Sequence, residues 1–246
     1  MHSTALFGFL WNAVGAAFIL PLYCFVYFVF SKRSTRPPPL PEAQALVPSL
    51  LLASYVPVAI AMGASLVFAS HPATVQGITA AFQFTPVVFV VFQKLLSLVL
   101  PQMRGSCERE DDLIARWHVK LAYLISAVVC GVTHLYCLVS IALAGKGSSI
   151  SFSGVFLPNP DSVIPGSDMN LPEGSTLFMH FDNLLISITC IFWAGFMLRE
   201  RVGEVKFRMT LAVFVLAVAC FILGPGATLS AALYLSEDCG LIELVE

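Results

Sequence analysis

The sequence predicts an all-α protein, a polytopic membrane helix bundle of about six transmembrane helices that forms a single domain over residues 1–246. Three observations carry this prediction: 58% of the residues are hydrophobic, only 11% are charged, and the mean hydropathy is +0.85. A soluble domain averages about 25% charged residues, so this chain is too apolar to present an ordinary water-facing surface. Lipid is the solvent that suits it.

Six apolar stretches are long enough to cross about 30 Å of hydrocarbon at about 1.5 Å per helical residue. No internal repeat relates them, so the inverted-repeat architecture of many transporters gains no support. The first stretch follows an N-terminus without basic residues and is longer than the core of a signal peptide, which predicts a retained span. The predicted spans lie near 6–30, 46–70, 78–100, 118–143, 176–198 and 207–235.

Glycine and proline mark two further features of this bundle. Gly224-Pro225-Gly226 falls inside the last span and predicts that the helix there is kinked or split. The longest connection, residues 145–175, is rich in Gly, Pro, Ser and Asp. It could form a lumenal cap over a pocket or a flexible loop.

Basic residues gather in the first, third and fifth connections, whereas the second and fourth hold only Lys146. Twelve of the thirteen basic residues therefore lie on one side, which the positive-inside rule assigns to the cytoplasm. Both termini are then expected on the lumenal side of an endoplasmic reticulum membrane. The twelve residues are Lys32, Arg33, Arg36, Lys94, Arg104, Arg109, Arg116, Lys120, Arg199, Arg201, Lys206 and Arg208.

Several classes of function find no support in the composition or the motifs. The net charge of −2 gives no reason to expect nucleic acid as a partner. The seven cysteines form no Cys-x-x-Cys pair and no zinc-type spacing, so we predict no metal site. No glycine-rich phosphate loop occurs. The sequence gives no indication of protein partners.

The most informative polar residue is Asp182, the only carboxylate well inside an apolar stretch. An acid in that setting costs about 2.5–3.5 kcal/mol at the bilayer centre, so a protein that keeps one usually needs it. The predicted topology brings polar groups of three helices to one layer. This layer could be a hydrogen-bond network that fixes packing, or a pocket in which the acid keeps its proton and donates it. Its members are Asp182, Gln83, His134, Tyr136, His180 and Asn183.

Three other residues carry both a functional and a structural interpretation. Trp193 shares a helix face with Asp182 and could face a carbocation, or could simply pack in the bundle or at the interface. Glu42 lies at the start of the second span, where the helix dipole favours an acid and suffices to explain it. Lys94 lies inside the third span and is expected to extend to the interface.

A set of spaced motifs extends over most of the chain. They are Gly15-Ala-Ala-Phe-Ile-Leu-Pro-Leu-Tyr23, the segment from Pro41 to Pro57 that contains Glu42 and Tyr55, Gln83-Phe-Thr-Pro86 with Gln93, and His180-Phe-Asp-Asn-Leu-Leu followed by Trp193. Together these motifs resemble the fungal transmembrane terpene cyclases of meroterpenoid biosynthesis.

The resemblance implies cyclisation of a prenylated, often epoxidised, precursor, which begins when an acid protonates an epoxide or alkene. It implies carbocation chemistry without a metal or organic cofactor, and the partners it implies are a hydrophobic prenylated molecule and the lipid bilayer. Asp182 matches the acid expected in the family, and Glu42 is the candidate for a second. With His134, expected beside Asp182 from topology, they form the predicted catalytic set. Substrate contacts are expected from Gln83, Tyr55, Tyr136, Asn183 and Trp193.

Two other classes remain open: a small-molecule or proton transporter or channel, and a non-catalytic accessory membrane protein. A transporter needs polar groups at successive depths on both sides of the membrane, whereas a cyclase needs an acid at one end of an apolar cavity. The cytoplasmic half of the predicted bundle is nearly free of polar groups apart from Lys94, which favours the enzyme. Family members often carry more N-terminal helices, so this chain could be a short form with an incomplete pocket and no activity.

Overall fold

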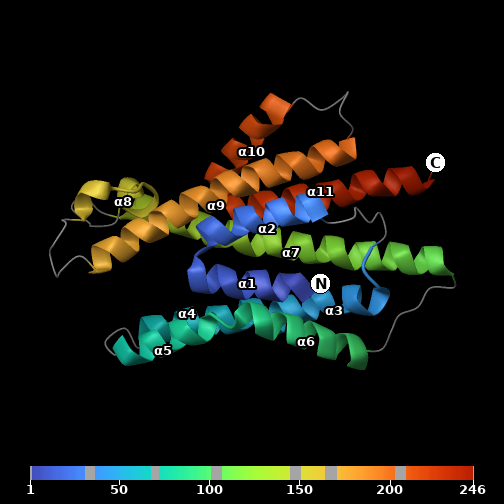
Figure 1. The fold of residues 1–246 in the computed structure, drawn as a ribbon, viewed down its shortest axis with the longest axis horizontal. Coiled ribbons are helices and arrows are strands. Elements are labelled where there is room, and N and C mark those ends of the chain that lie inside the picture. The colour runs from blue at the N-terminus through green and yellow to red at the C-terminus, as the bar shows by residue number, and fades with distance from the viewer. Residues whose placement is uncertain are drawn as a thin grey trace. The chain divides into compact units, whose positions relative to one another are not determined.

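The computed structural model describes residues 2–30, 37–67, 72–100, 107–144, 151–163, 171–202 and 209–245, and every regular element in these ranges is helical (Figure 1). The prediction of an all-α protein is therefore confirmed. The elements are α1 His2–Val14, α2 Ala16–Phe30, α3 Leu40–Leu50, the π-helical η1 Leu51–Tyr55, α4 Val56–Val67, α5 Pro72–Phe82, α6 Thr85–Val99, α7 Glu108–Leu143, α8 Phe152–Phe156, the 3-10 turn η2 Pro160–Ser162, α9 Leu171–Val202, α10 Met209–Leu223 and α11 Pro225–Val245.

In the ranges that the structure describes, fewer membrane-length helices are found than the six that the sequence predicts. Within the described ranges three helices are long and apolar enough to cross a membrane: Leu40–Ala61, Glu108–Leu143 and Glu173–Glu200. A fourth is added if Gln76–Phe82 and Thr85–Val99, which meet at an angle of 49°, count as one bent span. Ala16–Phe30 and Met209–Leu223 are apolar but shorter.

Glycine breaks explain why the first and last predicted spans are not continuous helices. Gly15 has φ 114° and separates α1 from α2, and Gly224 has φ 87° and separates α10 from α11. A left-handed residue ends a right-handed helix, and only glycine adopts it without a steric penalty. Pro225 follows at the first position of α11, where its missing N–H costs no helical hydrogen bond. The predicted kink or split of the last span is thus a split.

The chain divides into two compact units. In the unit formed by Met1–Gly15 and Val26–Ala122, α3 and α1 both pack against α6, and Leu40, Ala43 and Ala115 form a small core. In the unit formed by Ala16–Phe25 and Tyr123–Glu246, α9 packs against α11 and α10 around Ala194, Leu216 and Ala232 (Figure 1). The single-domain expectation stays a prediction.

Small residues fill the interior of both units, and large apolar residues face outward. Alanine predominates among the buried residues, whereas Phe18 is 65% exposed and Leu98 is 81% exposed. In water this distribution would be costly, because apolar surface drives burial there. In lipid it is expected, since small residues let helices approach closely and large ones contact acyl chains. The packing therefore agrees with a membrane protein.

Part of the long connection is ordered against the second unit. Both α8 and η2 pack against α9, which begins at Leu171, five residues before the predicted span. The remainder of this connection, residues 145–150 and 164–170, lies outside the described residues, as does its Lys146. The same is true of six basic residues used to predict the orientation: Lys32, Arg33, Arg36, Arg104, Lys206 and Arg208.

Candidate active site

Asp182 lies on α9, inside the membrane-length segment Glu173–Glu200, and is bonded to the start of α2. Its Oδ1 accepts a hydrogen bond from the backbone N–H of Ala17 at 2.5 Å, across 165 positions of sequence. The first N–H groups of a helix have no carbonyl partner within the helix, and the helix dipole makes this end partly positive. A carboxylate is the group that such an end binds best.

The local sequence explains why this backbone N–H is accessible to an acid. Gly15 ends α1 through its positive φ, so that α2 can begin afresh at Ala16. Ala16 and Ala17 are 1% and 7% exposed, which places the first turn of α2 against its neighbours. Side chains no larger than a methyl group allow that close approach. This contact is not predicted from the sequence, although a glycine followed by two alanines inside an apolar run is a usable signal.

His134 lies on α7 and forms a hydrogen bond with a backbone carbonyl near the break between α10 and α11. Its Nε2 is 3.1 Å from the carbonyl oxygen of Phe221. In a continuous helix this carbonyl would accept the N–H four residues later, but that residue is Pro225, which has none. Nε2 therefore carries the hydrogen and donates it to the orphaned carbonyl. This bond gives the imidazole a structural role inside an apolar region.

The ring of His134 also fits against a glycine that no other residue could replace without strain. A Cβ on Gly224 would lie 2.8 Å from Cγ of His134, and the φ of 87° disfavours any side chain. An aromatic cluster continues from this point onto α8. Between ring centroids, Phe156 lies 5.7 Å from His134, and Phe152 lies 5.1 Å from Phe156 and 5.7 Å from Phe221.

Gln83 belongs to the first unit and lies at the bend between α5 and α6. The side-chain amide of Asn12, on α1, donates to the backbone carbonyl of Gln83 at 3.1 Å. The rings of Phe9 and Phe84 are 6.0 Å apart at the same crossing. The Oε1 of Gln83 is buried and has no hydrogen-bond partner in the part of the chain that the structure describes. Asn12 was not identified from the sequence, although it is a polar residue in an apolar run.

Glu42 lies in the first turn of α3, as predicted, and it has a partner on α6. Its carboxylate forms an ion pair with Nζ of Lys94. The amide of Gln93 donates to the backbone carbonyl of Glu42 at 3.3 Å. The side chain of Glu42 is 20% exposed and that of Lys94 is 48% exposed. The ion pair with Glu42 therefore gives a second reason for Lys94 in the third predicted span, beside the expectation that its side chain extends to the membrane interface.

The remaining predicted residues have less distinctive surroundings. Tyr136, on α7, is 74% exposed. Asn183, next to Asp182 on α9, accepts the hydroxyl of Ser187 at its backbone oxygen at 2.8 Å. Trp193 is half-buried on α9, and Tyr55 ends η1 in the first unit.

The structure distributes the predicted residues over the two units. Asp182, His134, Tyr136, Asn183 and Trp193 belong to the second unit, whereas Glu42, Tyr55 and Gln83 belong to the first. Asp182, His134 and Gln83 form contacts with Ala17, Phe221 and Asn12 respectively, and the layer expected to join the three side chains stays a prediction. Each of these contacts satisfies a backbone group at a helix break.

An apolar groove of about 530 Å³ lies between α9, α10 and α11. This volume is within the usual range of small-molecule sites, about 300–1,000 Å³. Its one polar lining residue is Thr228, whose hydroxyl is bonded to the carbonyl of Gly224 at 2.9 Å. The described residues contain no group of three or more His, Cys, Asp or Glu that could hold a metal ion. The lining residues are Leu198, Leu211, Ala212, Val215, Leu216, Ala219, Leu223, Thr228, Ala231, Ala232 and Leu235.

The fold and the site define the class of protein: a helical chain with membrane-length apolar helices and an acid inside one of them. Within that class, the chain belongs to the CtvD domain family, whose model matches residues 1–239. The membership agrees with the resemblance of its spaced motifs to fungal terpene cyclases.

Three curated fungal proteins are similar to most of the chain. The terpene cyclases DEP1 of Alternaria brassicicola and Fusarium langsethiae are 28% and 27% identical over 92% of this chain. The terpene cyclase sdgD of Emericella nidulans is 26% identical over 76% of it. The alignments cover 66% of the length of each DEP1 protein and 48% of sdgD, so this chain spans part of its relatives' length. No solved structure matches the chain.

Proposed function

We propose that this protein is a membrane-bound terpene cyclase that converts a prenylated, epoxidised precursor of a meroterpenoid into a ring system. The observation that carries the proposal is the carboxyl group of Asp182, held within a membrane-length helix of a chain whose curated relatives are named terpene cyclases. An acid in apolar surroundings suits a reaction that begins with proton transfer to an uncharged substrate.

In this reaction Asp182 gives a proton to the epoxide oxygen, and the carbon–oxygen bond opens. The positive charge passes along the prenyl chain as new carbon–carbon bonds form. The last cation loses a proton or is captured by a hydroxyl group, so that the overall reaction is an isomerisation. No metal or organic cofactor takes part.

The other predicted residues assist this step. Trp193 offers an aromatic face that stabilises positive charge by cation–π attraction. Tyr55, Tyr136, Gln83 and Asn183 contact the substrate, and Glu42 and His134 complete the catalytic set. The apolar groove between α9, α10 and α11 suits a hydrocarbon chain, because it offers no unsatisfied polar group. The protein acts in the endoplasmic reticulum membrane with both termini in the lumen.

The proposal is tested by expressing the full chain in a fungal host that is fed an epoxyfarnesylated phenol. Wild type is compared with Asp182→Asn and Asp182→Ala, and cyclised products are measured by mass spectrometry. Asn keeps an oxygen that can accept the Ala17 N–H but has no acidic proton to transfer, whereas Ala lacks both the oxygen and the acid. We expect both variants to lose activity by at least about a hundredfold, as is common for a general acid.

The same comparison separates the alternatives. Full activity of Asp182→Asn together with loss in Asp182→Ala would assign Asp182 a packing role only. A wild-type protein that forms no product would favour a transporter or an accessory protein. Proton or solute flux in proteoliposomes then distinguishes those two functions.

A further inference from the structure

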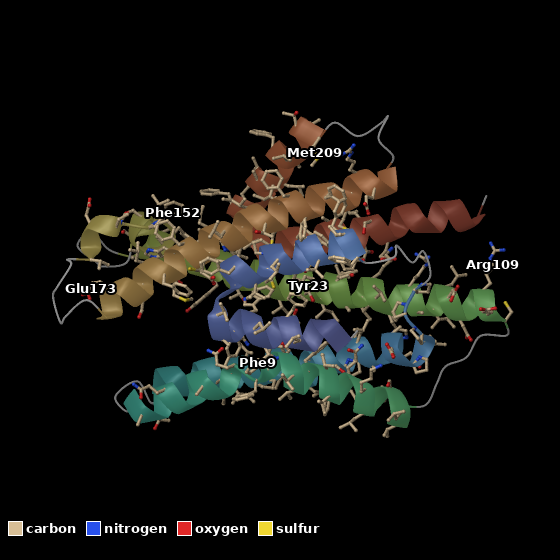
Figure 2. The ribbon with its side chains drawn as sticks, in the orientation of Figure 1. Phe9, Tyr23, Arg109, Phe152, Glu173 and Met209 are labelled. Atoms are coloured by element: carbon tan, nitrogen blue, oxygen red, sulfur yellow. The ribbon has the colours of Figure 1, made fainter. Side chains whose placement is uncertain are left out.

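We propose that the backbone N–H of Ala17 belongs to the catalytic machinery, because it stabilises the carboxylate that Asp182 becomes when it gives up its proton. This inference rests on the proposed function, in which Asp182 is the acid. The proposed catalytic and substrate-binding side chains all lie outside α2, so this inference adds a backbone group of α2 to the proposed site. Figure 2 shows α2, marked by Tyr23, as a helix of its own after the break that follows α1.

The geometry assigns the two carboxyl oxygens different tasks. Oδ1 accepts the hydrogen bond from the backbone N–H of Ala17, so this oxygen faces the start of α2. A proton on the carboxyl group is therefore carried by Oδ2. When the Oδ2–H bond breaks, its electron pair stays on the carboxylate and the proton forms an O–H bond with the epoxide oxygen. The proton that is released at the end of cyclisation balances the one that Asp182 donated, so the overall reaction consumes no proton.

The apolar surroundings of Asp182 make the Ala17 N–H donor important. Negative charge that develops on an acid among apolar helices is poorly solvated, which raises the barrier to proton transfer. A donor already fixed in place lowers that barrier without any reorganisation. Ala16, Ala17, Ile19 and Leu20 are all at least nine-tenths buried, so the first turn of α2 is held in position and shielded from water.

Ala17→Pro removes this one N–H, since proline has none and is tolerated in the first turn of a helix. Ala16→Pro is the matched control: it makes the same change one position earlier and leaves the Ala17 N–H in place. The two alanines are similarly buried, at 7% and 1% exposed, so the added ring is accommodated under similar constraints. The kcat and KM are measured with the epoxyfarnesylated phenol in microsomes. Thermal unfolding is followed on the full chain in detergent.

We expect Ala17→Pro to lower kcat by about ten- to a hundredfold, the loss typical when a charged acceptor loses one donor. The KM should change by less than about threefold, because the donor acts on the acid rather than on the substrate. Ala16→Pro should keep kcat within about threefold of wild type. Equal losses of kcat in both proline variants would overturn the inference.

Failure of this inference is distinguishable from failure of the proposed function. If Asp182→Asn is inactive but Ala17→Pro keeps its kcat, Asp182 is the acid and α2 has no catalytic part. If Asp182→Asn is active, the role of Asp182 as the acid and the role of the Ala17 N–H are both contradicted. Should Ala17→Pro unfold, Asp182→Glu tests the same point, because it keeps the acid but moves its oxygens by one methylene group. An unchanged kcat in that variant overturns the inference, and a tenfold or larger loss with unchanged KM supports it.

Discussion

At the scale of single residues, three polar side chains of the apolar segments, those of Asp182, His134 and Asn12, bond to backbone groups at helix breaks. Asp182 accepts the N–H of Ala17 after the break at Gly15. His134 donates to the carbonyl of Phe221 before Pro225, and Asn12 donates to the carbonyl of Gln83 at the α5–α6 bend. Lipid cannot satisfy an open backbone group, so a broken helix in a membrane needs such a partner. One physical rule thus accounts for all three.

The His134 contact leads to a stability prediction. His134→Phe keeps an aromatic ring but leaves the Phe221 carbonyl without a donor, so we expect a loss of about 1–3 kcal/mol in the free energy of unfolding. His134→Gln retains a side-chain N–H and should lose less. Thermal unfolding in detergent provides the measurement. If the two variants are equally stable, the bond to Phe221 does not stabilise the α10–α11 break.

Sequence reasoning located these polar residues but not their partners. Asp182 was identified because a carboxylate is rare in an apolar run. Its partner is a backbone N–H, which every residue except proline possesses and which leaves no trace in the sequence. The expected neighbours, Gln83 and His134, were inferred from depth alone, and their place beside Asp182 stays a prediction.

At the scale of elements, glycine and proline decided where the helices begin and end. The split at Gly224 was predictable, because Gly-Pro-Gly cannot continue a helix. The split at Gly15 was not predicted, because one glycine in an apolar stretch is common in membrane helices. A hydropathy profile does not detect such a break, so the two helices on either side of it are predicted as one span. For this reason six spans were expected, and fewer membrane-length helices are found among the described residues.

The ion pair between α3 and α6 supports a prediction about helix packing. Lys94→Met leaves the partly buried carboxylate of Glu42 without its cation, and we expect it to cost about 1 kcal/mol. In Glu42→Gln the charge is gone, so adding Lys94→Met should cost little more. A double-mutant cycle on unfolding in detergent measures the coupling. Additive effects would show that the pair contributes nothing to the α3–α6 contact.

At the scale of the whole molecule, the chain combines interiors rich in alanine with an exterior rich in Phe and Leu. Such an exterior needs lipid, so we expect the protein to stay in the membrane fraction during washes with high salt and alkaline carbonate. Only detergent should release it, and immunoblotting of the fractions checks this. Release by carbonate would contradict the assignment of Leu40–Ala61, Glu108–Leu143 and Glu173–Glu200 as spans.

The sequence by itself determined the helical class, its suitability for lipid and the presence of a break at Gly224-Pro225-Gly226, and it identified Asp182 as an acid within an apolar segment. Composition and local conformational preference are properties of short segments, so they can be read without knowing how those segments pack. The family motifs are likewise visible in the chain alone.

Only the tertiary structure decided what the polar residues touch. The bond from Ala17 to Asp182 joins positions 165 apart, the one between His134 and Phe221 spans 87, and the pair of Lys94 with Glu42 spans 52. Contacts of this kind depend on which faces of distant helices meet, and that is set by the fit of many small side chains at once. The sequence shows the acid, whereas the backbone N–H that binds it is identified only by the fold, which brings Asp182 to Ala17.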